Sequence, residues 1–418
     1  MFIPFQQANL NLSDHLKATG KQGLTYTAMA AELQEFIAQK KGMVEDVMDV
    51  FEKGAEFVAS IAGDLFPVFS IVGPIVKLAL DNKESKETRY MTEQFQKVRD
   101  HLEVVSEQVQ QINQEIKKSG MDADYFSVEE NISNQFRKFM DVLNAKPQYR
   151  EVRKKTFLEY FNKTGGNRNL HTLYDAVTGN NFAGESILEI TLNYEQKSRR
   201  VVEEFCAMLK KLFCVGLITL LGQAALKGDD EEKLLQEWIE KIKVVQSKID
   251  VVIEDCINSF PTQAEEEAKR IVRDQSDKTN QQLADVMLEH LKKKYDWVCW
   301  SVRVFNSPPQ LFGKPKDFQG LTGRSRFTVE DSNEKLNVVV SYSTSPEPVD
   351  KPKIQSWLLE QKKLSVISVA ERLFEAIPAC VVHTIRSSCQ RLAFSSSFSD
   401  ELLFFEQNKK FHVFLHSA

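Results

Sequence analysis

The stretch that decides the fold is Phe57–Leu80, which reads FVASIAGDLFPVFSIVGPIVKLAL. It is the most apolar long run in the chain, and its only formal charges are Asp64 and Lys77. Burying about ten of its large apolar side chains stabilises the protein by roughly 15–30 kcal/mol relative to leaving them in water. A solvent-facing helix is therefore excluded, and either protein or lipid must cover this run.

Two prolines shape the same run. Pro67 and Pro74 each remove a backbone donor and crowd the preceding turn, so one straight helix is not expected. We predict two or three short helical pieces, arranged as a buried apolar hairpin bent near Gly63–Pro67 or Gly73–Pro74. The side chains expected to form the core or a membrane element are Phe57, Ile61, Leu65, Phe66, Phe69, Ile71, Val72, Ile75 and Leu80.

A second apolar run, Leu212–Leu226, carries no charge and ends a helix predicted over residues 185–227. It is too short to cross a bilayer alone, because about 20 residues are needed. Asp64 and the two prolines make the first run a poor transmembrane helix as well. Both runs are expected to be hidden in a soluble protein, either as bundle core or as a concealed membrane-active element. The candidates in the second run are Leu212, Phe213, Leu217, Ile218, Leu220 and Leu221.

Amphipathic helices are predicted around these runs. Glycine and proline are scarce, at 17 and 12 of 418 residues, which favours long elements. The apolar side chains from Phe95 to Ile116 recur at spacings of three and four, the pattern of a coiled-coil seam. The predicted helices cover residues 82–118, 126–145, 148–163, 185–227, a segment from about 231 to a break at Pro261, and 262–294.

The character of the chain changes near Tyr295. Aromatic and β-branched residues predict strands at 297–305, 336–342 and 411–416, with weaker strands at 381–385 and 392–394. Helices are predicted at 354–361 and 365–377, and a loop at 313–326. The sequence thus predicts a mainly α protein: an elongated multi-helix bundle with a small C-terminal α+β domain. We expect a loose N-terminal arm at 1–24, a helical bundle domain at 25–294 and an α+β domain at 295–418.

Net charge, cysteine content and the absence of known motifs limit the classes of function expected for this chain. The net charge of -5 gives no general attraction to nucleic acid. The six cysteines are too few for a disulfide framework and favour a reducing compartment. No secretory signal is recognised at the N-terminus, so we expect a cytoplasmic protein, with membrane association or secretion by a non-standard route as the alternative. No phosphate-loop, dinucleotide, zinc or hydrolase motif is found, so we expect no enzyme, cofactor, metal or small-molecule substrate.

A basic cluster follows the predicted seam and allows two interpretations. It is either a solvated helix face or a surface that contacts an anionic membrane, each charge then contributing about 1 kcal/mol. Its members are Arg137, Lys138, Arg150, Arg153, Lys154 and Lys155.

Several non-repetitive stretches carry a resemblance to a known family. They are residues 66–112, 134–152 (NQFRKFMDVLNAKPQYREV), 161–179 (FNKTGGNRNLHTLYDAVTG), 184–214, 295–306 (YDWVCWSVRVFN) and 412–417 (HVFLHS). In this order they resemble the rapunzel family of fish proteins, which is similar to cephalotoxin-like proteins of invertebrate venoms. The resemblance implies a helical, toxin-like body, no enzyme activity and an association with skeletal and fin development. It brings no active-site motif, so no residue role is carried over.

These observations favour a non-enzymatic helical protein that acts through protein or membrane association. The more specific form of this hypothesis is a pore-forming protein that conceals its apolar helices. The alternative is an intracellular interaction scaffold, in which the seam from Phe95 to Ile116 and residues 295–418 bind partners. The expected partners are proteins, a lipid membrane or a second copy of the chain, and not nucleic acid.

Overall fold

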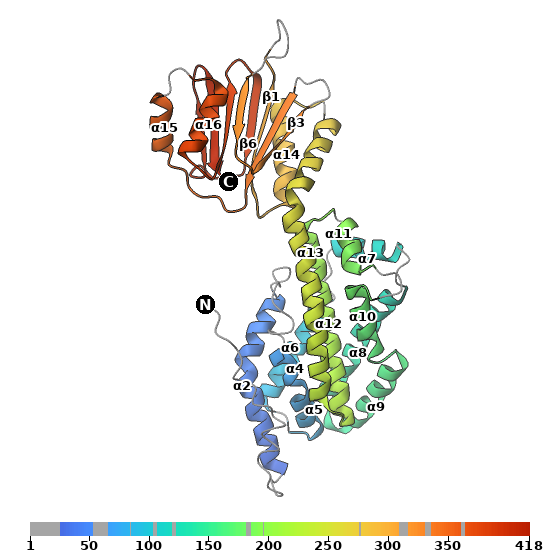
Figure 1. The fold of residues 1–418 in the computed structure, drawn as a ribbon. Coiled ribbons are helices and arrows are strands. Elements are labelled where there is room, and N and C mark those ends of the chain that lie inside the picture. The colour runs from blue at the N-terminus through green and yellow to red at the C-terminus, as the bar shows by residue number, and fades with distance from the viewer. Residues whose placement is uncertain are drawn as a thin grey trace. The chain divides into compact units, whose positions relative to one another are not determined.

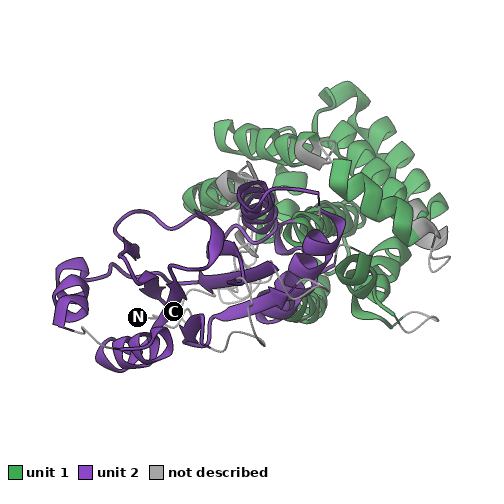
Figure 2. Cartoon of the chain, turned by 90° about the horizontal axis from the view of Figure 1, so that it is seen from above, with its two compact units in different colours: residues 1–194, 201–252 green, residues 195–200, 253–418 purple. Residues whose placement is uncertain are grey.

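The chain forms two compact units in the computed structural model. The first comprises residues 1–194 and 201–252, and the second residues 195–200 and 253–418 (Figure 2). The residues that the structure describes are 26–52, 66–83, 85–102, 107–118, 123–180, 185–194, 196–275, 277–308, 317–330, 336–360 and 364–418. The arm predicted at residues 1–24 lies outside them, and the domain boundary predicted at residue 295 stays a prediction.

The described part of the first unit is helical (Figure 1). Its helices are α2 (Tyr26–Glu52), α4 (Phe66–Ser70), α5 (Val72–Leu80), α6 (Lys86–Leu102), α7 (Glu107–Lys118), α8 (Ala123–Leu143), α9 (Pro147–Lys163), α10 (Arg168–Thr178), α11 (Ile187–Tyr194) and α12 (Arg199–Lys227). The long helix α13 (Glu231–Asp274) begins in this unit, and the boundary between the units falls inside it. The helix predicted over 82–118 is represented by α6 and α7, with residues 103–106 outside the described part.

Helix α12 is the core of the first unit. Two glycines let its neighbours approach closely: a Cβ at Gly216 would lie 2.5 Å from Leu170 of α10, and one at Gly222 would lie 2.2 Å from the Phe139 ring of α8. Gly228 ends the helix in the left-handed conformation, with φ +82°, which glycine adopts without steric cost. These two glycines lie about 120° apart around the helix, and each lets a different helix pack closely against the apolar run.

The prediction of a single helix over residues 185–227 is wrong. The structure ends α11 at Tyr194 and begins α12 at Arg199, because Gln196 and Lys197 adopt positive φ angles of 47° and 59°. Left-handed backbone at a non-glycine residue needs tertiary support. The Lys197 ammonium supplies one such contact, an ion pair at 2.9 Å to Asp255 of α13.

The break predicted at Pro261 is also wrong, because α13 continues through it. A proline inside a helix loses one backbone hydrogen bond and crowds the preceding turn. Here Phe260 and Ala264 on either side are buried in the core of the second unit, and this packing outweighs the local cost. The chain instead ends α13 at Asp274, and Thr279 opens α14 (Asn280–Lys294) with a capping box to Gln282.

The second unit contains two four-stranded sheets whose paired strands are antiparallel. The first has the order β3-β4-β1-β6 and the second β2-β5-β8-β7. The strands are β1 (Cys299–Asn306), β2 (Gln319–Thr322), β3 (Arg326–Glu330), β4 (Leu336–Ser343), β5 (Cys380–Arg386), β6 (Gln390–Ser396), β7 (Leu403–Gln407) and β8 (Phe411–Ser417). Helices α15 (Lys351–Glu360) and α16 (Val366–Ala376) complete the unit.

Four layers result, with helices outside and the two sheets between them (Figure 1). Alternate residues of β1 define the layers: Val302 and Val304 pack toward α13 and α14, whereas Phe305 packs toward Phe414 of the other sheet. Helix α16 covers the outer face of the second sheet, where Gly320 of β2 passes so close that a Cβ there would lie 2.7 Å from the Ile367 backbone. The predicted fold class, mainly α with a small C-terminal α+β part, is confirmed.

The strands that the sequence missed share one property. Strands β2, β3 and β7 lie at sheet edges, and the segment holding β2 was predicted to be a loop. The central strands β1, β4, β5 and β8 are buried on both faces and therefore read as apolar runs. Edge strands are short and partly exposed, so their pattern resembles that of a loop.

Candidate functional site

The described part of the first apolar run is covered by protein. Phe69, Ile71, Val72 and Ile75 are buried, and Leu80 is partly exposed. Phe66 begins α4, whereas Phe57, Ile61 and Leu65 lie outside the described residues, as does the first half of the predicted hairpin. The folded chain therefore hides the second half of this run.

The second apolar run is hidden in α12. Within the described residues, α12 is the one helix long and apolar enough to cross a membrane, and almost all of its apolar window is buried. At 29 residues it is about 43 Å long. Each predicted candidate in it is buried: Leu212, Phe213, Leu217, Ile218, Leu220 and Leu221.

The predicted seam is occupied by the chain itself. Phe95 and Val98 of α6 and Val109, Ile112 and Ile116 of α7 are buried. Helix α6 packs against α2 and α8, and α7 packs against α11. In this state the seam is core rather than a docking surface for a partner helix.

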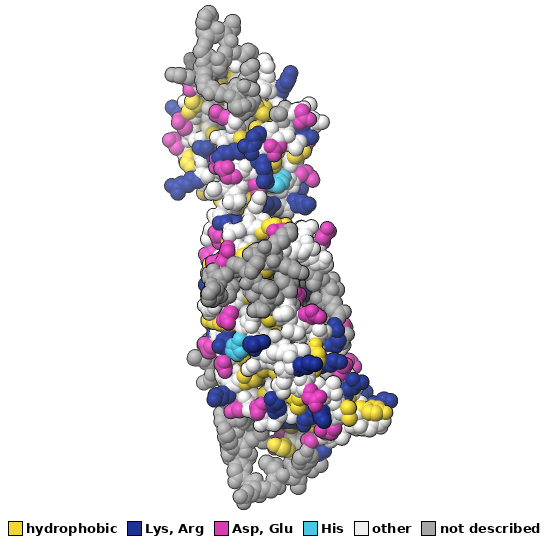
Figure 3. Space-filling model, turned by 90° about the vertical axis from the view of Figure 1, so that its right-hand side faces the viewer, with side chains coloured by type: hydrophobic (Ala, Val, Ile, Leu, Met, Phe, Trp, Pro, Cys, Tyr) yellow, Lys and Arg dark blue, Asp and Glu magenta, His cyan; other side chains and the backbone are white. Residues whose placement is uncertain are grey.

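The predicted basic cluster divides between α8 and α9. Arg137, Arg153 and Lys155 are exposed, and Lys138 and Lys154 are partly exposed. Figure 3 shows Lys and Arg side chains mixed with acidic and hydrophobic ones on the lower half of the face that it displays.

Helix α9 also exposes two large apolar side chains close in sequence to its cations. Tyr149 and Val152 are more than half exposed, beside the basic residues 153–155. An exposed aromatic ring among basic residues is typical of the interface between a membrane and water.

Arg150 does not belong to this surface, and the prediction of a surface position is wrong for it. Only 4% of the residue is exposed. Its guanidinium donates to the Ala79 carbonyl, to Asn82 Oδ1 at 2.7 Å and to the Ala145 carbonyl at 2.9 Å. A planar guanidinium can bind several acceptors at once, so Arg150 joins the C-terminal ends of α5 and α8 instead of meeting solvent.

A cavity of about 510 Å³ brings the two predicted groups together. Its lining includes Ile75 and Ala79 from the first apolar run and Arg150 from the basic cluster. Arg89 and Lys146 add two exposed cations, whereas Glu93 is the one carboxylate in the lining. Pockets of this size hold small ligands, and an apolar wall beside cations suits an anion with an apolar tail.

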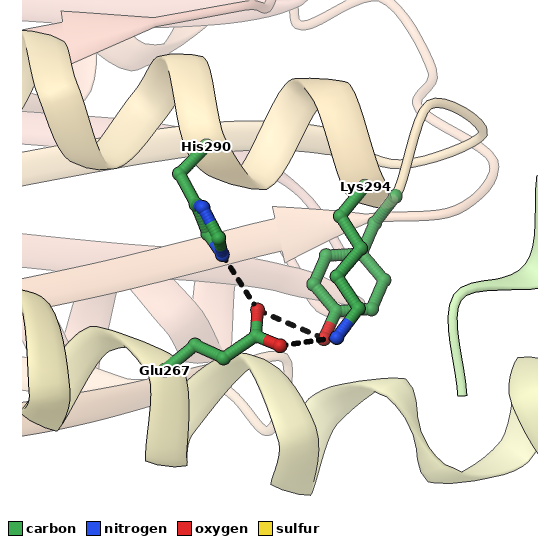
Figure 4. A network of polar contacts seen from close by, with 4 residues as sticks. Glu267, His290 and Lys294 are labelled. Carbon is green, nitrogen blue, oxygen red and sulfur yellow. Dashed lines mark hydrogen bonds and ion pairs between the residues drawn. The ribbon is translucent and has the colours of Figure 1, made fainter. Parts of the chain in front are cut away.

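A cluster of titratable groups joins α13 to α14 in the second unit (Figure 4). Glu267 accepts hydrogen bonds from His290 Nε2 at 2.9 Å, from Lys294 Nζ and from the Tyr295 hydroxyl at 3.2 Å. Burial acts to raise the pKa of Glu267, but the hydrogen bonds and charges of His290 and Lys294 outweigh it, so the pKa lies below its usual value. Burial and the Glu267 charge raise the pKa of Tyr295. Both oxygens of the Glu267 carboxylate are used in the clamp, which fits a structural role.

The thiols and potential metal ligands give no catalytic arrangement within the described ranges. No group of three or more His, Cys, Asp or Glu side chains is placed to hold a metal ion there. Burial raises the pKa values of the Cys380 and Cys389 thiols to about 11, so both remain protonated near neutral pH. The predictions of no cofactor and no enzyme activity stay predictions.

Comparison with known proteins identifies the family. Residues 81–278 match the model of the cephalotoxin-like middle helical domain. The chain is 34% identical over 200 residues to the protein named rapunzel from Danio rerio, an alignment that covers 48% of this chain and 88% of that relative. The chain belongs to the rapunzel family. The domain match contains α12 and the basic cluster, and the sheets of this rapunzel-family chain lie beyond it. No solved structure matches the chain.

Proposed function

We propose that this rapunzel-family protein acts without catalysis, by associating with lipid membranes and exposing α12 to them. The observation that carries the proposal is the character of α12, a helix of 29 residues whose apolar window is almost wholly covered by protein. Its length of about 43 Å exceeds the roughly 30 Å hydrocarbon core of a bilayer. A helix of this kind can exchange protein contacts for lipid contacts without exposing its apolar surface to water.

The charges at the ends of the uncharged segment fit this role. Residues 212–226 span about 22 Å, and Lys211 precedes them while Lys227 follows them. Burial lowers the pKa of Lys211, because its ammonium is partly removed from water. In a bilayer, lysine side chains at both ends of the segment extend toward the headgroups, so the segment can cross a hydrocarbon layer thicker than its own length.

Helix α9 supplies a first contact with an anionic surface. Arg153 is exposed beside Tyr149, with Val152 next to it in sequence, and Lys155 is exposed on another side of the helix. Each such cation contributes about 1 kcal/mol near anionic lipids, and the aromatic ring suits the headgroup region. The match to a cephalotoxin-like domain supports a toxin-like helical body for the same residues.

Photo-crosslinking from lipid acyl chains tests the insertion step. Vesicles rich in phosphatidylserine and carrying a diazirine on the acyl chain are mixed with the full chain, and crosslinked peptides are identified by mass spectrometry. We expect crosslinks within residues 212–226 and fewer with zwitterionic vesicles. Crosslinks confined to α9, or none anywhere, would contradict insertion of α12.

A charge-reversal pair tests the contact step. The double variant Arg153→Glu, Lys155→Glu should weaken binding to anionic vesicles roughly tenfold or more in a flotation assay. The matched control is Lys243→Glu, Lys248→Glu on the exposed face of α13, which should bind like the wild type. Equal losses in both variants would show that net charge, rather than the cations of α9, governs binding.

A further inference from the structure

The layer between the two sheets of the second unit contains a buried cation without a carboxylate partner. Arg303 of β1 is 0% exposed, and its guanidinium lies 5.5 Å from the centre of the Phe414 ring on the opposite sheet. Among the described residues, Glu267 is the one buried carboxylate, and it is engaged with α14 in the clamp of Figure 4. Arg303 therefore has no anionic side chain from the described chain to balance its charge.

Only some of the N–H donors of the Arg303 guanidinium have hydrogen-bond partners. Nη2 donates to Ser341 Oγ at 2.6 Å and to the Ser301 carbonyl at 3.3 Å. Nε and Nη1 are buried without a hydrogen-bond partner in the described protein. An arginine has five N–H donors, so the Nε donor and both Nη1 donors remain for a ligand.

The neighbouring histidines cannot supply the negative charge. His416 Nδ1 donates to the Ser417 carbonyl at 2.6 Å, so its Nε2 accepts from the Ser341 hydroxyl at 2.7 Å. Burial lowers the pKa of His416 to about 4, so this ring is neutral at pH 7. His383 is 0% exposed, and burial together with the charges of Arg303 and Arg326 lowers its pKa well below the usual value. These rings thus supply no negative charge to Arg303, and Arg326 adds a second positive charge near His383.

Burial of the guanidinium does not remove its charge. Burial lowers the pKa of Arg303 to about 9, which leaves the group protonated at pH 7. A buried charge is retained in a folded protein when it is paired and hydrogen-bonded. Both requirements are met by one small anion that accepts from Nε or Nη1.

We propose that the layer between the sheets binds a small monovalent anion, a halide or a carboxylate of the size of formate, against Arg303. The site lies in the second unit, so it is independent of α12 and of the proposed membrane association.

Anomalous diffraction from the full chain crystallised in sodium bromide tests the site directly. We expect a bromide peak within hydrogen-bonding distance of Arg303 Nε or Nη1. A water molecule at that position, with no anomalous signal, would overturn the proposal.

Calorimetry after refolding in different sodium salts tests the site in solution. At constant ionic strength, bromide, chloride or formate should raise the thermal midpoint by about 3–5 °C per tenfold concentration above the dissociation constant, relative to bulky gluconate. A response to formate alone identifies a carboxylate site, and a response to the halides identifies a halide site. The same midpoint in all four salts would count against any anion.

Two variants locate the effect. Arg303→Met should lose the dependence on the anion, whereas Arg386→Met, on the exposed end of β5, should keep it. The proposal is wrong if Arg303→Met responds like the wild type. If Arg303→Met does not fold, hydrogen exchange of wild-type peptides 299–306 and 411–417 decides: slower exchange in bromide than in gluconate supports the site, and equal exchange contradicts it.

Discussion

Replacing Glu267 with glutamine tests whether the clamp of Figure 4 stabilises the second unit. Glu267 is only 4% exposed and accepts from three side chains of the α14 region. Lys294, with a side chain 13% exposed, is left without its counter-charge by the substitution. The perturbation thus removes a charge while nearly preserving the shape of the side chain.

The expected loss follows from the burial of the partners. Breaking a buried ion pair by removing one partner costs about 3–5 kcal/mol, and a hydrogen bond to a charged group contributes about 1.5–3 kcal/mol. The His290 side chain is 36% exposed, so solvent screens part of its interaction. Glutamine still accepts one hydrogen bond. We therefore expect the free energy of unfolding of the second unit to fall by about 2–3 kcal/mol.

Urea unfolding, followed by hydrogen exchange of peptide 280–294, measures this loss. A double-mutant cycle with Lys294→Met should give a coupling energy of about 1.5–3 kcal/mol. The matched control is Glu265→Gln, because Glu265 pairs with the exposed Lys269 on the same helix and should cost under about 0.5 kcal/mol. A coupling energy within about 0.5 kcal/mol of zero, or equal losses for both glutamates, would refute the reasoning.

Acid should weaken the clamp in a defined direction. The pKa of Glu267 is lower in the folded chain than its ordinary value of about 4.3, so the folded state favours the carboxylate. The resulting stability is fully present above the ordinary pKa and is lost as pH falls through the folded pKa. Between about pH 5 and pH 3, the wild type should lose more stability than Glu267→Gln, and parallel curves would contradict this assignment.

Three further substitutions test the packing by urea or thermal unfolding. Pro261→Ala should raise stability by about 1–3 kcal/mol, because alanine restores a backbone donor inside α13; a loss would show that proline is required there. Gly222→Ala should cost about 1–3 kcal/mol of stability, since its Cβ would lie 2.2 Å from Phe139. The control Gly42→Ala, with nothing within 4 Å of its Cβ, should be neutral or stabilising. Similar changes in stability for the two variants would contradict this explanation. Thr279→Ala should cost about 1 kcal/mol through loss of the capping box of α14, and an unchanged midpoint would exclude that role.

Periodicity and apolar runs made much of the fold predictable. The burial of α12, the strands β1, β4, β5 and β8, and the helices α15 and α16 were read from side-chain pattern alone. An amphipathic helix buries one apolar stripe and a central strand buries both of its faces, so the spacing of apolar residues in the local sequence reveals both. The family resemblance was likewise visible in the sequence.

Contacts between distant residues decided the two helix boundaries that the local sequence pattern predicted wrongly. The break before Arg199 depends on two left-handed residues and on the Lys197–Asp255 ion pair. The continuity of α13 through Pro261 depends on burial against the sheet.

The candidate sites show the same division. The sequence by itself determined which side chains are apolar or basic, and therefore that α12 had to be covered and that residues 153–155 form a charged stretch. Only the tertiary structure decided that Arg150 joins two helix ends and that Arg303 lies between two sheets without a buried carboxylate from the described chain. The reason is physical: solubility and helical period act between near neighbours, whereas desolvation of a charge depends on every segment that folds over it.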